Sequence, residues 1–213
     1  MICISYGTIA LNDLLEKLKT TRMAEIRIDL LGLTKDEIAA VFRSHPNLIA
    51  TCRPDTMGID AQRELLLTAV ESGAAYVDVE VEAPSSFKKK MVEAAHAKGC
   101  KVIVSYHNYT ETPSRETLLG IMVEMVDDGA DILKLATMAN SAADAARILS
   151  LYENPIKPMV ALAMGEAGKV TRIAIPLLGA PFTFAAPEGA ATAPGQLTDI
   201  GMNTIYKTIG HEE

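Results

Sequence analysis

A lysine and a histidine stand in or directly after apolar stretches of this chain, and together they indicate carbonyl chemistry. Lys134 lies inside the run DILKLATMA (131–139), and His107 follows the run KVIVSY (101–106). A neutral lysine amine attacks a ketone or aldehyde to form an imine, and the protonated imine withdraws electrons from the neighbouring carbon. A histidine, whose ordinary pKa is about 6.5, can then move a proton at that carbon. The pair predicts proton abstraction next to a carbonyl through a Schiff base.

The expected surroundings of Lys134 favour the neutral amine. Burial disfavours a charged ammonium group and therefore lowers its pKa. Nearby cations such as Arg27 or Arg53 would act in the same direction. We therefore expect the pKa of Lys134 to lie below that of an ordinary lysine.

The elements that must position these residues alternate along the chain. Short apolar runs predict eight strands, and amphipathic runs between them predict helices, three of which end at a glycine (Gly73, Gly99, Gly129) shortly before the next strand. The predicted strands are 2–5, 24–29, 48–52, 76–80, 101–106, 131–135, 158–163 and 182–186, and helices include 12–19, 61–72, 87–98 and 115–128.

Eight strands that are each followed by a helix predict an α/β protein, a single (β/α)8 TIM barrel over residues 1–213. An open, doubly wound sheet is the alternative. It would normally carry a glycine-rich turn after the first strand, whereas ISYGTIAL has one glycine. In a barrel the active site lies at the carboxyl ends of the strands.

Ionisable or polar residues recur at that end of nearly every predicted strand. Taken singly, each has a structural explanation: Glu25 and Arg27 could form a buried ion pair, and a lone histidine is usually structural. Their recurrence favours a site, because a barrel interior prefers Val, Ile and Leu. The set is Glu25, Arg27 and Asp29, which we expect on one face of the second strand, with Arg53, Asp78, Glu80, His107, Lys134, Arg172, Thr192 and Gln196.

Composition excludes several classes of partner. The 213 residues are 49% hydrophobic and carry a net charge of −7, with no basic block, so nucleic acid and anionic membrane surfaces are not expected. The longest charge-free run, 173–187, is too short and proline-broken to span a bilayer, and the N-terminus lacks the basic start of a signal peptide. Three scattered cysteines (Cys3, Cys52, Cys100) indicate buried, reduced thiols in a cytoplasmic protein.

No metal or cofactor is expected. His45, His96 and His211 lie on a loop, a helix face and the terminus, without ligand spacing. The basic stretch FKKKM (87–91) is interpreted as a solvated helix face.

Six segments in order make the chain resemble the type I 3-dehydroquinate dehydratases of the shikimate pathway, which serves aromatic amino acid biosynthesis. The resemblance extends from the first strand to the last strand–helix loop. Its segments are EIRID (25–29), TCRP (51–54), SYHNYTETP (105–113), DILKLATMA (131–139), MGEAGKVTRI (164–173) and ATAPGQL (191–197).

The resemblance implies a substrate, 3-dehydroquinate, and a homodimer without cofactor. It implies that Lys134 forms a Schiff base with the C3 ketone and that His107 moves the protons of a syn elimination to 3-dehydroshikimate and water. It further implies that Arg172 pairs with the substrate carboxylate, a task suited to a planar guanidinium. The remaining implied substrate contacts are Thr192 and Gln196 at the carboxylate end, Glu25, Arg27 and Arg53 at the C4 and C5 hydroxyls, Ser5, and Met164 against the ring.

The chain also differs from the family pattern at three positions. In the family, an acidic residue commonly lies four positions after the arginine that corresponds to Arg53, and it helps to orient the histidine. Met57 occupies that position in this chain, and Asp55 is the nearest acid. Asn108 replaces a frequent aspartate, and Thr192 replaces a frequent serine while keeping the hydroxyl.

Two other functions share part of this pattern. A Schiff-base aldolase would use Lys134 but would not need the carboxylate-binding residues Arg172, Thr192 and Gln196. A catalytically silent barrel that binds a carboxylate metabolite would need neither His107 nor Lys134. An assay of aldol donors against dehydroquinate distinguishes the aldolase from the dehydratase, and the presence of both His107 and Lys134 argues against the silent barrel.

Overall fold

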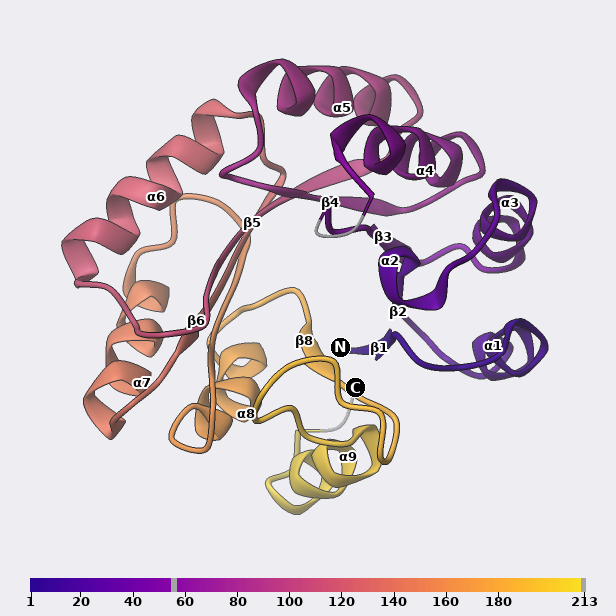
Figure 1. Cartoon of the computed structure of the whole chain (residues 1–213). Helices are drawn as coiled ribbons and strands as arrows, with labels where there is room; N and C mark the ends of the chain where they lie inside the picture. Colours follow the sequence, from indigo (N-terminus) through magenta and orange to yellow (C-terminus); the bar gives the residue numbers. More distant parts are fainter. Residues whose placement is uncertain (55–56, 212–213) are drawn as a thin grey trace.

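Eight parallel strands alternate with helices around a nearly closed barrel (Figure 1). The computed structural model describes residues 1–54 and 57–211. The strands are β1 (Ile2–Tyr6), β2 (Ala24–Arg27), β3 (Leu48–Thr51), β4 (Tyr76–Glu80), β5 (Lys101–Asn108), β6 (Ile132–Met138), β7 (Met159–Met164) and β8 (Thr183–Ala185). The helices are α1 (Leu11–Leu18), α2 (Ile28–Leu31), α3 (Lys35–Ser44), α4 (Ile59–Glu71), α5 (Ser85–Ala97), α6 (Arg115–Asp127), α7 (Ala142–Leu149), α8 (Lys169–Leu177) and α9 (Asp199–Thr208), with a 3-10 turn η1 (Ser150–Glu153).

The strand order confirms the predicted barrel. Neighbours in the sheet follow β7-β6-β5-β4-β3-β2-β1-β8, so the first and last strands of the chain pair with each other. A doubly wound sheet would instead reverse its order near the middle and leave its terminal strands apart. The open-sheet alternative is therefore wrong.

Local sequence explains how the helices return to the sheet. Gly73, Gly99 and Gly129 follow α4, α5 and α6 with φ of 103°, 71° and 91°, a backbone region that disfavours residues with a Cβ. Each glycine permits the turn that starts the next strand, as the sequence predicts. Most apolar faces pack into one core, in which Cys3, Cys52 and Cys100 are buried free thiols, as expected, and a smaller second cluster forms beside α9.

The prediction that Asp29 belongs to the second strand is wrong. The second strand ends at Arg27, and Ile28–Leu31 forms one turn of helix instead of continuing the strand. Gly32 closes that turn with φ of 62° and donates its N–H to the carbonyl of Ile28 at 3.2 Å. Asp29 therefore does not share a strand face with Glu25 and Arg27.

The interpretation of FKKKM as a solvated face is also wrong at one position. Lys89 and Lys90 are exposed, but Lys88 is buried between α5 and α6. Its ammonium group donates to the carbonyl of Val81 at 2.6 Å and to Asp128 at 2.5 Å. These partners explain how the helix buries a lysine.

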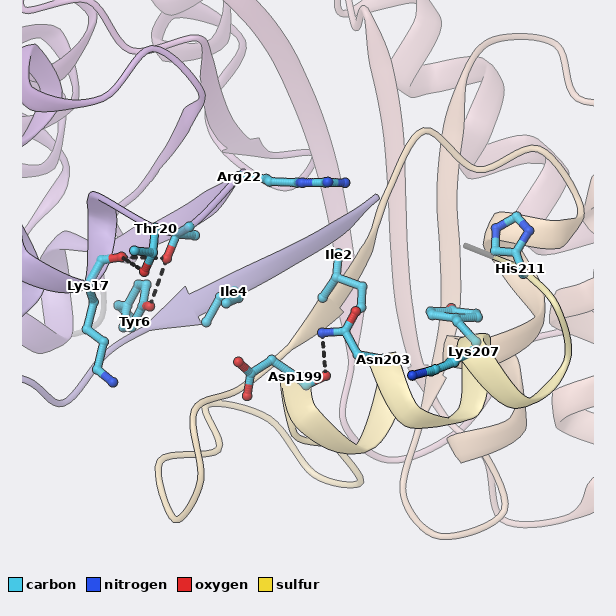
Figure 2. A pocket seen from close by; sticks show the side chains of 12 residues that line it. Ile2, Ile4, Tyr6, Lys17, Thr20, Arg22, Asp199, Asn203, Lys207 and His211 are labelled. Carbon is cyan, nitrogen blue, oxygen red and sulfur yellow. Dashed lines mark hydrogen bonds between the residues drawn. The ribbon is translucent and has the colours of Figure 1, made fainter. Parts of the chain in front are cut away.

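A pocket of about 600 Å³ lies outside the barrel, where β1 is flanked by α1 and α9. Figure 2 shows Ile2 and Ile4 of β1 beside Asp199, Asn203 and Lys207 of α9. This outer pocket contains none of the predicted site residues, most of which line a different pocket at the carboxyl ends of the strands. No helix within the described ranges is long and apolar enough to cross a membrane.

Candidate active site

Strand register brings the predicted site residues to the same face. Ser105 of β5 is the direct neighbour of Lys134 on β6, and Ser5 of β1 is the neighbour of Glu25 on β2. Because side chains alternate along a strand, His107 points to the same side as Ser105. Lys134, which is far from Glu25 in sequence, reaches it across the barrel interior.

One pocket at this end is lined by every residue that the family resemblance implies except Ser5. Ser5 is fully buried and donates to Glu25 at 2.6 Å, while it accepts a hydrogen bond from Thr192 at 3.0 Å. Ser5 thus supports the pocket from beneath. The lining comprises Glu25, Arg27, Thr51, Arg53, His107, Tyr109, Lys134, Ala136, Leu162, Met164, Arg172, Phe184, Thr192, Ala193 and Gln196.

Lys134 is buried and paired with two carboxylates. Its Nζ lies 2.8 Å from Asp78 Oδ2 and 3.3 Å from Glu25 Oε1, and 4.6 Å from the ring centre of Phe184. Burial alone would lower the pKa of Lys134, but Asp78 and Glu25 outweigh it and raise the pKa above its usual value. The expected lowering of this pKa is therefore wrong, because the sequence pattern did not reveal the two carboxylates.

Asp78 connects Lys134 with Arg53, which follows β3. Its Oδ1 accepts from Ser105 at 2.6 Å and lies 3.0 Å from Arg53. Burial would raise the pKa of Asp78, but Arg53 and Lys134 hold it far below the usual range. Arg53 also lies 3.4 Å from Glu80. Asp78 is thus a charged carboxylate shared by two cations.

His107 is placed to remain neutral. Burial and the positive charges of Arg53 and Lys134 hold the pKa of His107 well below its usual value. Its ring stacks on that of Tyr109 with centres 6.3 Å apart. A neutral imidazole near neutral pH is the form that accepts a proton.

The position of the family's acidic residue is filled by an apolar side chain. Met57 packs against the core, and its sulfur contacts the thiol of Cys52 at 3.6 Å. Asp55, the nearest acid in the sequence, lies outside the described residues.

Arg172 lies almost fully buried at the other side of the pocket. Its Nη2 donates to the carbonyl of Pro194 at 3.4 Å, and within the described part of the chain its Nε has no hydrogen-bond partner. Burial lowers the pKa of Arg172 to about 10. A buried guanidinium without a carboxylate partner is suited to bind an anionic ligand.

The loop after β8 folds over this arginine. Gln196 accepts from the backbone N–H of Thr192 at 2.8 Å and from its hydroxyl at 3.2 Å. Gly195 has φ of 69°, and a Cβ there would lie 2.4 Å from the carbonyl oxygen of Gly165. The glycine therefore permits the close approach of this loop to the loop after β7.

Arg27 does not form the ion pair with Glu25 that was the structural alternative for these two residues. It forms a two-point ion pair with Asp29, at 2.6 Å and 3.1 Å, rather than a pair with Glu25. Glu25 instead accepts hydrogen bonds from Ser5, Thr51 and Lys134.

Three residues that matter to this arrangement were not assigned to the site from the sequence. Asp78 is one of the strand-end residues but is not among the implied substrate contacts, and Thr51 and Ser105 belong to neither set. The available signal was alternation: Asp78 interrupts the apolar run YVDVE much as Lys134 interrupts its own.

Comparison with known proteins gives one consistent result. The model of the family "Type I 3-dehydroquinase" matches residues 2–213. The 3-dehydroquinate dehydratase of Desulfotalea psychrophila is 35% identical, covering 96% of this chain and 96% of its own. That of Dehalococcoides mccartyi is 35% identical, covering 99% and 96%.

Solved structures agree. The crystal structure of 3-dehydroquinate dehydratase from Geobacillus kaustophilus has a TM-score of 0.85 at 25% identity and covers 98% of this chain and 90% of that one. The Aquifex aeolicus enzyme has a TM-score of 0.81 at 27% identity, with 98% of each chain covered.

Proposed function

The chain belongs to the type I 3-dehydroquinase family and dehydrates 3-dehydroquinate in the shikimate pathway, and from that premise we propose how its residues perform the reaction. Lys134 forms an imine with the C3 ketone, and the protonated imine makes the C2 proton acidic. His107 accepts that proton as a neutral imidazole and then donates a proton to the departing C1 hydroxyl. One water then hydrolyses the product imine, which restores the C3 ketone and frees the Lys134 amine. This consumes the equivalent of the water released when the imine formed, so the net products are 3-dehydroshikimate and the one eliminated water. The aldolase and the silent barrel are not favoured by any of these findings.

Binding is assigned to the remaining residues of the pocket. Arg172 pairs with the substrate carboxylate, with Thr192 and Gln196 closing that end. Glu25, Arg27 and Arg53 hold the C4 and C5 hydroxyls, Ser5 supports Glu25 and Thr192, and Met164 packs against the ring. These assignments are supported by their common position in one pocket.

One observation carries the mechanism: the buried amine of Lys134 and the neutral imidazole of His107 project from adjacent strands into the same pocket. The test is to mix the protein with dehydroquinate and add borohydride, which reduces an imine to a stable secondary amine. We expect one adduct per chain, located on the peptide that contains DILKLATMA. Turnover without trapping, or trapping at another lysine, would contradict the mechanism.

The assembly and location are proposed on separate grounds. The family resemblance supports a homodimer, which light scattering would detect as twice the 22.8 kDa of one chain. Three buried free thiols support a cytoplasmic location. The family match over residues 2–213 supports one catalytic domain spanning residues 1–213.

A further inference from the structure

Asp78 contacts the amine of Lys134 from beneath the pocket. Its side chain is fully buried, and it is not part of the pocket lining, so substrate does not reach it. Its Oδ2 is nevertheless the acceptor nearest to Lys134 Nζ, at 2.8 Å. Its Oδ1 is fixed by Ser105 and Arg53. Both oxygens are thus held, and the one facing Lys134 has a defined direction.

The proton balance of imine formation gives this geometry a consequence. An ammonium group and a ketone yield an iminium ion and one water, so two N–H protons leave with the ketone oxygen. One N–H proton and the positive charge stay on nitrogen. Of the acceptors around Lys134, one must therefore keep its hydrogen bond through the reaction, while the other contacts of the ammonium are lost.

Glu25 and Asp78 differ in their ability to keep a hydrogen bond to Lys134 throughout imine formation. Glu25 is farther from Nζ, at 3.3 Å, and lines the pocket, where substrate would compete for it. Asp78 is closer and inaccessible to substrate. The other charged or titratable groups around Lys134 are Cys3 on β1, Arg53 after β3 and His107 on β5, and none of these supplies a carboxylate.

We propose that Asp78 is the positioning residue for the nucleophile: it holds the Lys134 ammonium in the free enzyme and keeps the last N–H proton of the iminium as its counter-ion. Ser105 and Arg53 fix Asp78 in this orientation. The proposal depends on the Schiff base at Lys134 proposed above. It adds a carboxylate on β4 that acts through Lys134 without contacting substrate.

The experiment compares Asp78→Asn with Glu25→Gln. Trace acetylation by acetic anhydride reports the fraction of neutral amine at each lysine, and peptide mass spectrometry resolves Lys134 over neutral to alkaline pH. Removing an anion that favours the charged amine must lower the pH at which Lys134 becomes reactive. We expect both variants to lower the midpoint pH of Lys134 acetylation, and Asp78→Asn to lower it by more than Glu25→Gln. Turnover should also fall at least about tenfold in Asp78→Asn, with a smaller change in KM.

Lys88 provides the folding control within the same samples. It is buried against Asp128 on the far side of β4, so its acetylation profile should stay unchanged in Asp78→Asn. If Asp78→Asn does not fold, Glu25→Gln alone decides. With Asp78 as the remaining carboxylate, Glu25→Gln must still give the borohydride adduct at Lys134 when dehydroquinate is saturating, and its absence would overturn the assignment to Asp78.

The outcomes separate the two proposals. If wild type traps at Lys134 but Glu25→Gln lowers the midpoint more than Asp78→Asn does, the assignment to Asp78 is overturned and the Schiff base stands. If wild type does not trap at Lys134, the mechanism itself fails. An equal change at Lys88 and Lys134 in Asp78→Asn would show general loosening and would also overturn the positioning role.

Discussion

Two lysines of this molecule, Lys134 and Lys88, are buried to nearly the same extent but in different settings. They are 6% and 5% exposed, and each has an aspartate partner, Asp78 and Asp128. Lys88 lies outside the barrel, and one of its acceptors is the carbonyl oxygen of Val81. Lys134 lies inside, below a pocket that His107 also lines. Burial alone therefore does not identify a nucleophile.

The difference lies in access and in the neighbouring groups. Lys88 satisfies a backbone carbonyl and joins two helices, and it does not line the catalytic pocket. Lys134 faces that pocket, where a ketone can replace part of its hydrogen bonding. We therefore expect substitutions at Lys134 to affect chemistry and substitutions at Lys88 to affect stability.

The largest expected effect is that of Lys134→Ala. Turnover should fall below detection and no borohydride adduct should form, because the electron-withdrawing imine is lost. Thermal unfolding, followed by circular dichroism, should show that the barrel is retained. Residual turnover near that of wild type would place the nucleophile elsewhere and remove the contrast with Lys88.

His107→Ala should separate imine formation from proton transfer. The amine of Lys134 is still present, so the borohydride adduct should form, whereas removal of the C2 proton fails. We expect turnover to fall by about 10²–10⁴-fold, the usual contribution of a general acid–base group. Mass spectrometry and the growth of absorbance from the conjugated enone product measure the two steps. Loss of both adduct and turnover would indicate a folding defect instead.

Arg172→Lys should weaken substrate use despite the retained charge. An ammonium group cannot make the paired contacts of a guanidinium with a carboxylate. The loss of a buried charge pair costs about 2–5 kcal/mol, and it should appear in kcat/KM. A variant within about threefold of wild type, or roughly 0.65 kcal/mol, would mean that the carboxylate binds elsewhere.

Lys88→Met should lower stability and leave turnover unchanged. It removes the partner of the Val81 carbonyl and of Asp128, and an unsatisfied buried group costs about 1–3 kcal/mol. Lys89→Met, on the same helix but exposed, is the matched control and should change stability by less than about 0.5 kcal/mol. Urea unfolding measures both. A loss of turnover in folded Lys88→Met would contradict the distinction between the two lysines.

The same pair of lysines shows how far the sequence could be interpreted. Periodicity and glycine positions predicted eight strands and the barrel, because these signals are local. Polar residues within apolar strands predicted where the site lies. The partners could not be predicted, since Lys134 meets Glu25 and Asp78 only through barrel closure. The burial of Lys88 is hidden from the sequence for the same reason: the two lysines that follow it are exposed, and Asp128 comes from the end of the next helix.

The smallest expected effect concerns the acid that this chain lacks near His107. Met57→Glu should leave kcat/KM within about threefold of wild type or modestly higher, because His107 is already held neutral by burial and by Arg53 and Lys134. A carboxylate that reaches His107 would raise its pKa. Since the imidazole must be neutral to accept a proton, the acid limb of the kcat/KM profile would then move to higher pH. Stability should fall by about 1 kcal/mol, because Met57 packs against the core.

Met57→Leu separates these two consequences. It keeps an apolar side chain against Cys52 and adds no charge, so it should leave the acid limb in place. A shift in Met57→Glu that is absent from Met57→Leu would show that position 57 can orient and charge His107 in this barrel. A tenfold loss of kcat/KM in both would mean instead that Met57 supports the active site through packing. An unshifted acid limb in Met57→Glu would mean that a carboxylate at position 57 does not reach His107, and that the site depends on Tyr109 stacking and the surrounding cations.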